Sequence, residues 1–292
     1  MKITEAFERG EFVVTAEVGP PKGFHIEHML EEAKTYLSKI TAVNVTDNQS
    51  SVMRLGSLAT CKALKDIGLT PIFQMTCRDR NRIALESDLL SAALFGIENL
   101  LLLTGDHTKL GDHPQAKPVF DLDSVSLIHA VKQLESGVDL GGNELVGEPP
   151  KFAKGAVVSP CSDSVDVQLA KMERKVAAGA EYFQTQAVYE PEKFIKFMEK
   201  AKQFGKPVQL GIVIPKSVGM CRYMNANVAG IHIPEEMIDE LKADKEKTKA
   251  GTTGVEIAAR IIRECKPYCQ GVHIMAMGWE SKVPALLEQA GI

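Results

Sequence analysis

The most informative segment of this chain for its fold is Leu100-Leu101-Leu102-Leu103-Thr104-Gly105-Asp106-His107. Four consecutive leucines predict a strand that is buried on both faces, as in a parallel sheet. Gly105 permits a sharp turn, which places Asp106 at the carboxyl end of the strand. In a barrel of parallel strands, that end carries the chemistry. The stretch therefore predicts a mouth to which other strands also contribute functional side chains.

Apolar runs of strand length alternate with helical patterns along the whole chain. The predicted strands are residues 12–18, 42–46, 71–77, 100–103, 156–159, 182–186, 208–214 and 271–276. The predicted helices are 26–39, 55–67, 80–95, 163–179, 192–204 and 280–290, with two or three more pieces in 216–267. A further helix is predicted to begin after Asp121 or Asp123, either of which can cap it, and to run to about Leu134. This alternation favours an α/β fold of the (β/α)8 TIM barrel type, with residues 1–292 as one domain. No Gly-x-Gly-x-x-Gly follows the first strand, which argues against an open dinucleotide-binding sheet.

Composition and charge exclude several classes of protein. Hydrophobic residues make up 45% and charged residues 25% of the chain, as in ordinary globular proteins. The net charge of −4 and the lack of a basic tract argue against a nucleic-acid partner. No apolar run approaches the roughly 18 residues of a membrane span, and no signal peptide precedes the first strand. The six scattered cysteines then predict reduced thiols and a cytoplasmic location.

Polar side chains stand where the predicted strands end. One such residue is explained equally well as a hydrogen-bonded polar group of the core, because an unpaired polar group there is costly. The whole set at one end of a barrel favours a functional site. Its members are Glu17, Thr46, Asp47, Asn48, Gln74, Thr76, Thr104, Asp106, Ser159, Gln184 and Gln186.

Two carboxylates in this set predict acid and electrostatic roles. Glu17 lies between Ala16 and Val18, and apolar surroundings would raise its pKa so that it acts as an acid near neutral pH. Asp106 lies on a more open Gly-Asp-His loop and is expected to stay ionised. Two carboxylates in unlike environments are typical of one proton donor and one stabiliser of positive charge.

A basic cluster lies on the predicted helix 163–179, beside the mouth. Lys171, Arg174 and Lys175 form either a solvated basic face or an anchor for a phosphate or an anionic ring. Both interpretations stay open at this point.

Two groups of residues resemble metal sites only loosely. Gly105-Asp106-His107 is repeated as Gly111-Asp112-His113, and a solvated loop explains the repeat better than a divalent cation. Cys265, Cys269 and His273 do not have the spacing of a standard zinc module. We therefore predict no metal site.

Several short motifs together resemble the methylenetetrahydrofolate reductase family over nearly the whole chain. Each motif is weak alone, whereas their shared order and spacing are specific. Phe120-Asp121-Leu122-Asp123-Ser124 is most similar to the short, catalytic-domain-only reductases of anaerobes and acetogens. The other matching motifs are Ala16-Glu17-Val18-Gly19-Pro20-Pro21, Val45-Thr46, Thr76-Cys77, Thr104-Gly105-Asp106, Arg174-Lys175-Val176-x-x-Gly179-Ala180 and Thr185-Gln186.

The resemblance implies flavin-dependent reduction of 5,10-methylenetetrahydrofolate to 5-methyltetrahydrofolate, by a hydride from N5 of the reduced flavin. Glu17 would be the general acid at folate N10, Asp106 would stabilise the resulting cation, and Gln186 would bind the pterin. The flavin would be FAD, as in the family, with FMN as the alternative. The implied flavin-binding residues are Thr46, Gln74, Thr76, Gly105, Asp106, Arg174 and Lys175.

The resemblance also implies partners and leaves alternatives open. Short family members work with a small zinc-binding subunit that passes electrons, so this chain would be either an independent reductase or one subunit of such an assembly. A homo-oligomer and a place in the methyl branch of the reductive acetyl-CoA pathway are further expectations. A pterin-binding methyltransferase barrel without flavin is the alternative from another class, and an absorbance spectrum separates it from the reductase.

Overall fold

The leucine run forms strand β4 (Asn99–Leu103), and its side chains are buried on opposite faces. Leu100 and Leu102 belong to the large core of 64 buried residues that joins strands to the surrounding helices. Leu101 belongs to a smaller core of eight buried residues inside the barrel. Burial on both faces is what a strand of continuous leucines requires, since either exposed face would leave apolar surface in water.

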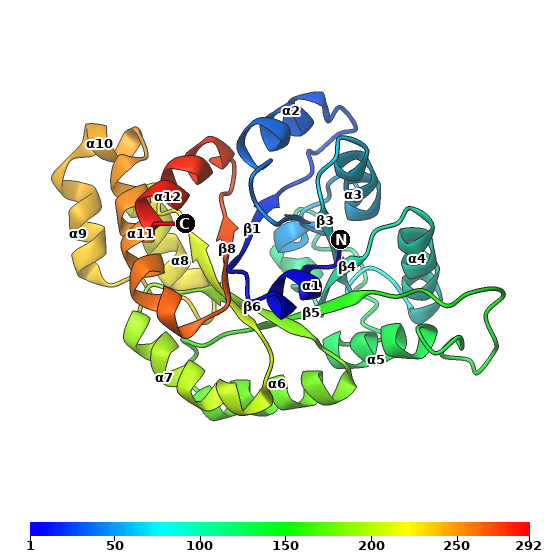
Figure 1. Cartoon of the computed structure of the whole chain (residues 1–292). Coiled ribbons are helices and arrows are strands. Elements are labelled where there is room, and N and C mark those ends of the chain that lie inside the picture. The colour runs from blue at the N-terminus through cyan, green and yellow to red at the C-terminus, as the bar shows by residue number, and fades with distance from the viewer.

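Eight parallel strands close into one barrel in this computed structural model, which describes residues 1–292 (Figure 1). Each strand pairs with the next one in the chain, and β1 also pairs with β8, where Thr15 lies opposite His273. The predicted (β/α)8 TIM barrel is therefore confirmed. The other strands are β1 (Val13–Val18), β2 (Ala42–Val45), β3 (Pro71–Thr76), β5 (Ala153–Val158), β6 (Tyr182–Ala187), β7 (Val208–Val213) and β8 (Gly271–Met275).

Helices surround the barrel (Figure 1) and follow the strands in the predicted order. None of them combines the length and the apolar character that a bilayer span requires. They are α2 (Glu27–Tyr36), α3 (Ser57–Asp66), α4 (Arg82–Leu94), α5 (Ser124–Leu134), α6 (Val165–Ala178), α7 (Pro191–Ala201), α8 (Val218–Asn227), α9 (Glu235–Ala243), α10 (Lys245–Lys249), α11 (Thr252–Cys265) and α12 (Val283–Ala290).

A short helix, α1 (Ile3–Glu8), precedes the first strand and was not predicted from the sequence. Figure 1 shows it lying across one end of the barrel. Ile3 and Ala6 are fully buried in the smaller core, and the backbone N–H of Ile3 donates to Asn99 at 2.7 Å. The helix therefore closes the amino-terminal end of the barrel and leaves the opposite end as its mouth.

Strand β5 begins at Ala153, three residues before the predicted start of that strand. Lys154 and Gly155 look like loop residues in the sequence, but both have partners in the fold. Lys154 forms ion pairs with Glu135 and Glu181 at 2.8 and 3.0 Å. A side chain at Gly155 would clash with the ring of Tyr182, since its Cβ would lie 2.3 Å from that ring. The predicted boundary was wrong because neither partner is local in sequence.

A layer of polar side chains crosses the inside of the barrel below the mouth. Barrel interiors are usually filled by branched apolar side chains, so buried polar side chains at this place must be stabilised by hydrogen bonds. Each of its members is at most 3% exposed, and hydrogen bonds connect them to one another. They are Thr15, Asn44, Gln184, Gln209 and His273, from β1, β2, β6, β7 and β8.

Candidate active site

One cavity of about 620 Å³ occupies the mouth of the barrel. It is lined by residues from most strands and from the loops that follow them, in agreement with the end at which barrel enzymes place their chemistry. Every candidate residue that the sequence supplied lines this same cavity. These residues are Glu17, Thr46, Gln74, Thr76, Gly105, Asp106, Arg174, Lys175 and Gln186.

Glu17, near the end of β1, has a polar environment at one carboxylate oxygen. The side-chain amide of Gln74 donates to its Oε1 at 3.0 Å, and Nε2 of His273 lies 3.3 Å from the same oxygen. The side chain of Glu17 is 13% exposed. The apolar surroundings expected from Ala16 and Val18 are absent, because those two residues face away from the barrel interior into the large core.

Asp106 follows a turn that only glycine permits at position 105. Gly105 has a φ of +91°, and a Cβ there would lie 3.0 Å from the Cβ of Thr76. The side chain of Asp106 is exposed in the mouth and has no hydrogen-bond or ion-pair partner in the chain. Its carboxylate is therefore free to face a ligand.

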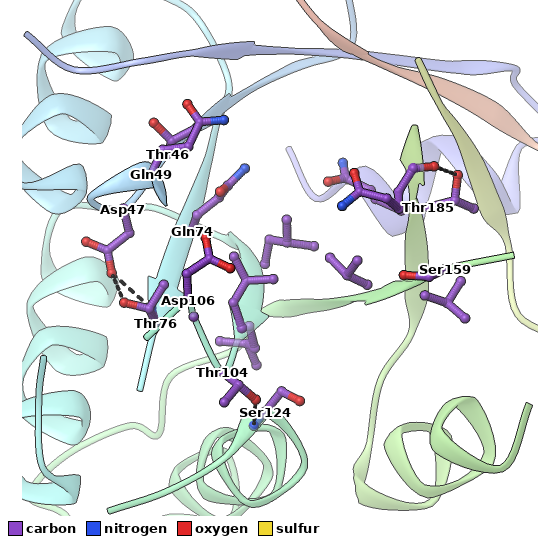
Figure 2. Close-up of a pocket in the computed structure, with 18 of the residues that line it drawn as sticks. Thr46, Asp47, Gln49, Gln74, Thr76, Thr104, Asp106, Ser124, Ser159 and Thr185 are labelled. Carbon is purple, nitrogen blue, oxygen red and sulfur yellow. Dashed lines mark hydrogen bonds between the residues drawn. The ribbon is translucent and has the colours of Figure 1, made fainter. Parts of the chain in front are cut away.

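Thr46 and Thr76 form a wall of the cavity beside Asp47. Thr46 is 2% exposed, and its Oγ1 is buried without a hydrogen-bond partner. Asp47 instead accepts two hydrogen bonds from the backbone and side chain of Thr76, both at 2.9 Å (Figure 2). A buried hydroxyl without a partner is costly, so Thr46 marks a position at which a ligand could complete the site.

Asp47 is held ionised by Arg80, which the sequence did not single out. Arg80 reaches both carboxylate oxygens of Asp47, at 2.8 and 3.1 Å. Burial alone would raise the pKa of Asp47, but the hydrogen bonds from Arg80 and Thr76 hold it below its usual value. This pair supports the wall from behind.

Arg78 is a second residue that sequence reasoning missed. It is 2% exposed and donates to the backbone carbonyls of Asn48 at 3.2 Å and Asp106 at 3.4 Å. It thereby ties the loop after β2 to the loop after β4. A buried arginine one residue beyond Cys77 carries no local signal of this role, because both acceptors are backbone atoms of distant segments.

Lys171, Arg174 and Lys175 bring positive charge to the mouth from α6. Lys175 donates to the carbonyl of Val157 at 2.6 Å. Burial and, to a smaller extent, the charge of Lys171 together lower the pKa of Lys175 to about 8, although Asp123 partly opposes the shift. The cluster lines the cavity instead of forming only a solvated face, which favours its interpretation as an anion anchor.

Gln186 lies at an irregularity of the barrel between β6 and β7, where the register shifts between Gln184 and Ala187. Its Oε1 accepts from the backbone N–H of Ala187 at 3.0 Å. This contact fixes the amide and leaves its Nε2 without a partner in the chain. The amide group is therefore available to a ligand in the mouth.

The structure assembles neither of the two loosely metal-like groups. No three or more His, Cys, Asp or Glu side chains are placed to hold a metal ion. His273 is engaged with Thr15 and Glu17, and His113 contacts Asp112 at 2.8 Å. Asp112 also pairs with Lys22, so the repeated Gly-Asp-His segment connects loops around the mouth.

Known proteins resemble this chain over most of its length. The sequence model of the family "Methylenetetrahydrofolate reductase" matches residues 2–291. "Methylenetetrahydrofolate reductase 2" of Schizosaccharomyces pombe is 25% identical over 229 residues, which are 75% of this chain and 35% of that protein. "5,10-methylenetetrahydrofolate reductase" of Escherichia coli is 24% identical over 265 residues, 87% of this chain and 82% of that protein. The chain thus spans about a third of the length of the fission-yeast relative.

Solved structures share the fold. A protein from Clostridium thermocellum that binds two copies of 5-methyl-5,6,7,8-tetrahydrofolic acid superposes with a TM-score of 0.67, at 16% identity, over 98% of this chain and 96% of that one. A 2,3-dimethylmalate lyase superposes with a TM-score of 0.53, at 12% identity, over 99% and 87%. Identities this low show a common barrel and nothing more. The match of the family model to residues 2–291 goes further, and it shows that this chain belongs to the methylenetetrahydrofolate reductase family.

Proposed function

We propose that this protein catalyses the flavin-dependent reduction of 5,10-methylenetetrahydrofolate to 5-methyltetrahydrofolate. The observation that carries the proposal is that Glu17, Asp106 and Gln186 line one cavity although 169 residues separate the first from the last. Membership of the family supports the reaction class. The side chains that line the cavity include carboxylates, amides and cations, which suit a pterin and an anionic cofactor.

The residues of the mouth fit a flavin. The unpartnered Oγ1 of Thr46 offers a hydroxyl that can donate to or accept from a ring edge. Thr76, Gln74 and Gly105 line the adjacent wall, where the missing Cβ of Gly105 brings backbone close to a planar ring. When bound and reduced, the flavin supplies the hydride.

The basic cluster of α6 would hold the anionic parts of the cofactor. Arg174 and Lys175 line the same cavity as Thr46 and Thr76, although they lie about 100 residues further along the chain than Thr76. The side chain of Arg174 is exposed. A guanidinium presents paired N–H groups that match a phosphate, whereas an ammonium acts as a point charge. Both FAD and FMN carry such a phosphate, and extraction of the bound cofactor distinguishes them.

Glu17 would act as the proton donor. Its carboxylic acid protonates N10 of the folate, the bond between N10 and the bridging carbon breaks, and an iminium cation forms between that carbon and N5. General acid catalysis of this kind contributes about 10²–10⁴-fold to a rate. The free carboxylate of Asp106 would stabilise the cation until hydride transfer to the carbon produces the methyl group.

Gln186 would orient the pterin. Its Oε1 is held by the backbone N–H of Ala187, so the side chain presents Nε2 in a fixed direction. A pterin ring edge carries several acceptors and donors in one plane, and an amide held in this way can select the orientation that brings N10 to Glu17.

The proposal is tested with purified protein. We expect an absorbance spectrum typical of a bound flavin, which bleaches under an anaerobic reductant and recovers when methylenetetrahydrofolate is added. A colourless protein that takes up neither FAD nor FMN would overturn the proposal and favour the methyltransferase alternative. Parallel assays with NADH and with an artificial dye as electron donor test the subunit alternative, which predicts activity with the dye alone.

A further inference from the structure

We propose that His273 is a positioning residue for Glu17, and that the polar layer inside the barrel fixes which ring nitrogen of His273 carries the proton. The histidine lies between Thr15 and Glu17: its Nδ1 is 3.0 Å from Oγ1 of Thr15, and its Nε2 is 3.3 Å from Oε1 of Glu17. It is only 3% exposed, and each ring nitrogen has one protein partner. The direction of these two hydrogen bonds follows from the rest of the layer.

The direction is set first at Gln209, on β7. Its side-chain nitrogen lies 3.2 Å from two backbone carbonyls, those of Val13 and Val272. A carbonyl only accepts, so the group facing them must be the NH₂ and not the oxygen of the amide. The oxygen of Gln209 then accepts from the amide of Gln184 at 3.1 Å, which fixes Gln184 as well.

Both amides consequently turn their nitrogen atoms, and not their oxygens, toward Thr15. The nitrogen of Gln209 lies 3.1 Å from its Oγ1, and that of Gln184 lies 3.3 Å away. Neither nitrogen can accept a hydrogen bond. Of the three side-chain partners of this fully buried hydroxyl, only Nδ1 of His273 can take its proton. Thr15 therefore donates to Nδ1, and His273 carries its own proton on Nε2.

The Nε2–H of His273 then points at Oε1 of Glu17, which also accepts from Gln74 at 3.0 Å. With two donors on Oε1, a proton carried by Glu17 belongs on Oε2. The arrangement holds the acid in one rotamer with one proton-bearing oxygen, which is what transfer to a single substrate atom requires. This catalytic consequence rests on the proposed function, whereas the tautomer of His273 does not.

The same geometry shows where Glu17 regains its proton. If His273 gave up its Nε2 proton, it would become an anion, because its Nδ1 carries no proton. Thr15 cannot replace the lost proton, since its other side-chain partners are the amides of Gln184 and Gln209, which are not acids. The polar layer therefore cannot deliver a proton to Glu17. Glu17 is reprotonated from the mouth of the barrel, to which its side chain is 13% exposed.

Nuclear magnetic resonance tests the tautomer directly. We would record long-range proton–nitrogen correlations of the imidazoles in ¹⁵N-labelled protein, without substrate. The chain has seven histidines, and the signals of His273 are identified by their loss in His273→Gln. The proposal expects protonated Nε2 and unprotonated Nδ1, retained in Thr15→Ser and replaced by a mixture in Thr15→Val. A proton on Nδ1 in the native protein, or an unchanged tautomer in Thr15→Val, would overturn it.

Half-reaction kinetics test the consequence for Glu17. His273→Gln keeps an N–H near the place of Nε2, and His273→Leu removes it. We expect His273→Leu to slow reoxidation of the reduced protein by methylenetetrahydrofolate roughly tenfold to a hundredfold, because it removes one hydrogen bond to the carboxylate that forms as Glu17 gives up its proton. His273→Gln should restore most of this rate, and both variants should be reduced at the native rate. His28→Gln, at a histidine whose side chain is 84% exposed, is the control.

The two experiments separate two failures. A protein that takes up no flavin contradicts the proposed function and leaves the tautomer measurement valid. A protein that reduces the folate equally well with leucine or glutamine at position 273 contradicts the positioning role and leaves the proposed function intact. Loss of flavin reduction in both variants would show a role in structure alone and would also overturn the positioning role.

Discussion

Gln74 on β3 donates a hydrogen bond of 3.0 Å to Glu17 on β1, across the intervening strand β2. Two strands that are not paired with each other thus meet through their side chains inside the barrel mouth. The contact uses Oε1 of Glu17, which also faces His273. It shows how the curvature of a closed barrel brings together polar groups that a flat sheet would keep apart.

Replacement of Glu17 by glutamine should separate folate chemistry from cofactor binding. Glutamine keeps an oxygen that can accept from Gln74, so the fold and flavin content should be unchanged. The proton for N10 is lost, and we expect folate-dependent reoxidation to slow about 10²–10⁴-fold. Stopped-flow absorbance measures this rate. Glu11→Gln, at an exposed surface glutamate, is the matched control, and near-native turnover in Glu17→Gln would remove the assigned role.

Replacement of Asp106 by asparagine should slow the folate half-reaction more than reduction of the flavin. The carboxylate has no partner in the chain, so its loss leaves no unpaired group behind. Because the charge is needed only when the cation develops, we expect a loss of about 10²-fold in folate reduction. The two half-reactions are timed separately, with Asp66→Asn on α3 as control. Equal losses in both would contradict this division of roles.

Replacement of Thr46 by valine should have opposite effects on the free and the loaded protein. Its buried Oγ1 has no partner, so removing the hydroxyl should raise the melting temperature of the flavin-free protein or leave it unchanged. The same change removes a hydrogen bond to the cofactor and should weaken flavin binding about tenfold. Differential scanning fluorimetry and flavin titration measure the two effects. A Thr46→Val protein that is destabilised yet binds flavin normally would show that the hydroxyl serves the fold.

Flavin binding should weaken as the pH rises through about 8, where Lys175 loses its charge. Burial lowers the pKa of Lys175 from its ordinary value of 10.5 to about 8. Between these values the unfolded chain binds more protons than the folded one, so the flavin-free protein should become more stable as the pH rises. Fluorescence titration between pH 7 and 9.5 measures the affinity. Lys175→Arg should remove the dependence, because arginine stays charged; persistence of the same dependence would assign it to another group.

Replacement of Arg80 by methionine should destabilise the protein strongly. Its guanidinium pairs with Asp47, whose side chain is only 1% exposed, and Asp88 lies 2.9 Å from its Nε. Loss of one partner leaves a buried charge without compensation, which costs about 3–5 kcal/mol. Urea denaturation measures the free energy of unfolding. The matched control is Arg82→Met, whose pair with Asp121 lies at the surface and should matter little; equal effects would contradict the burial argument.

The candidate site was predictable from the sequence to the extent that it depends on strand ends. Glu17, Gln74 and Asp106 each stand where an apolar run stops, and parallel strands place such ends at one edge. Arg78 and Arg80 were not predictable, because their partners are a carboxylate and backbone carbonyls on other strands and loops. Helix α1 was missed because six residues carry too little periodicity to indicate a helix.

His273 shows the limit most clearly. In sequence it stands near Cys265 and Cys269, which suggested a zinc group, and nothing nearby hints at a carboxylate partner. Closure of the barrel between β1 and β8 brings it beside Thr15, 258 residues away, and below Glu17.

The alternation of strands and helices, the single mouth and the kinds of side chain that line it were predictable, because hydrophobic period and strand ends are local properties of the chain. Which of those side chains meet was not predictable, because the contacts join segments far apart in the sequence. Barrel closure and strand register choose the neighbours of each polar group, and those neighbours fix where its protons lie.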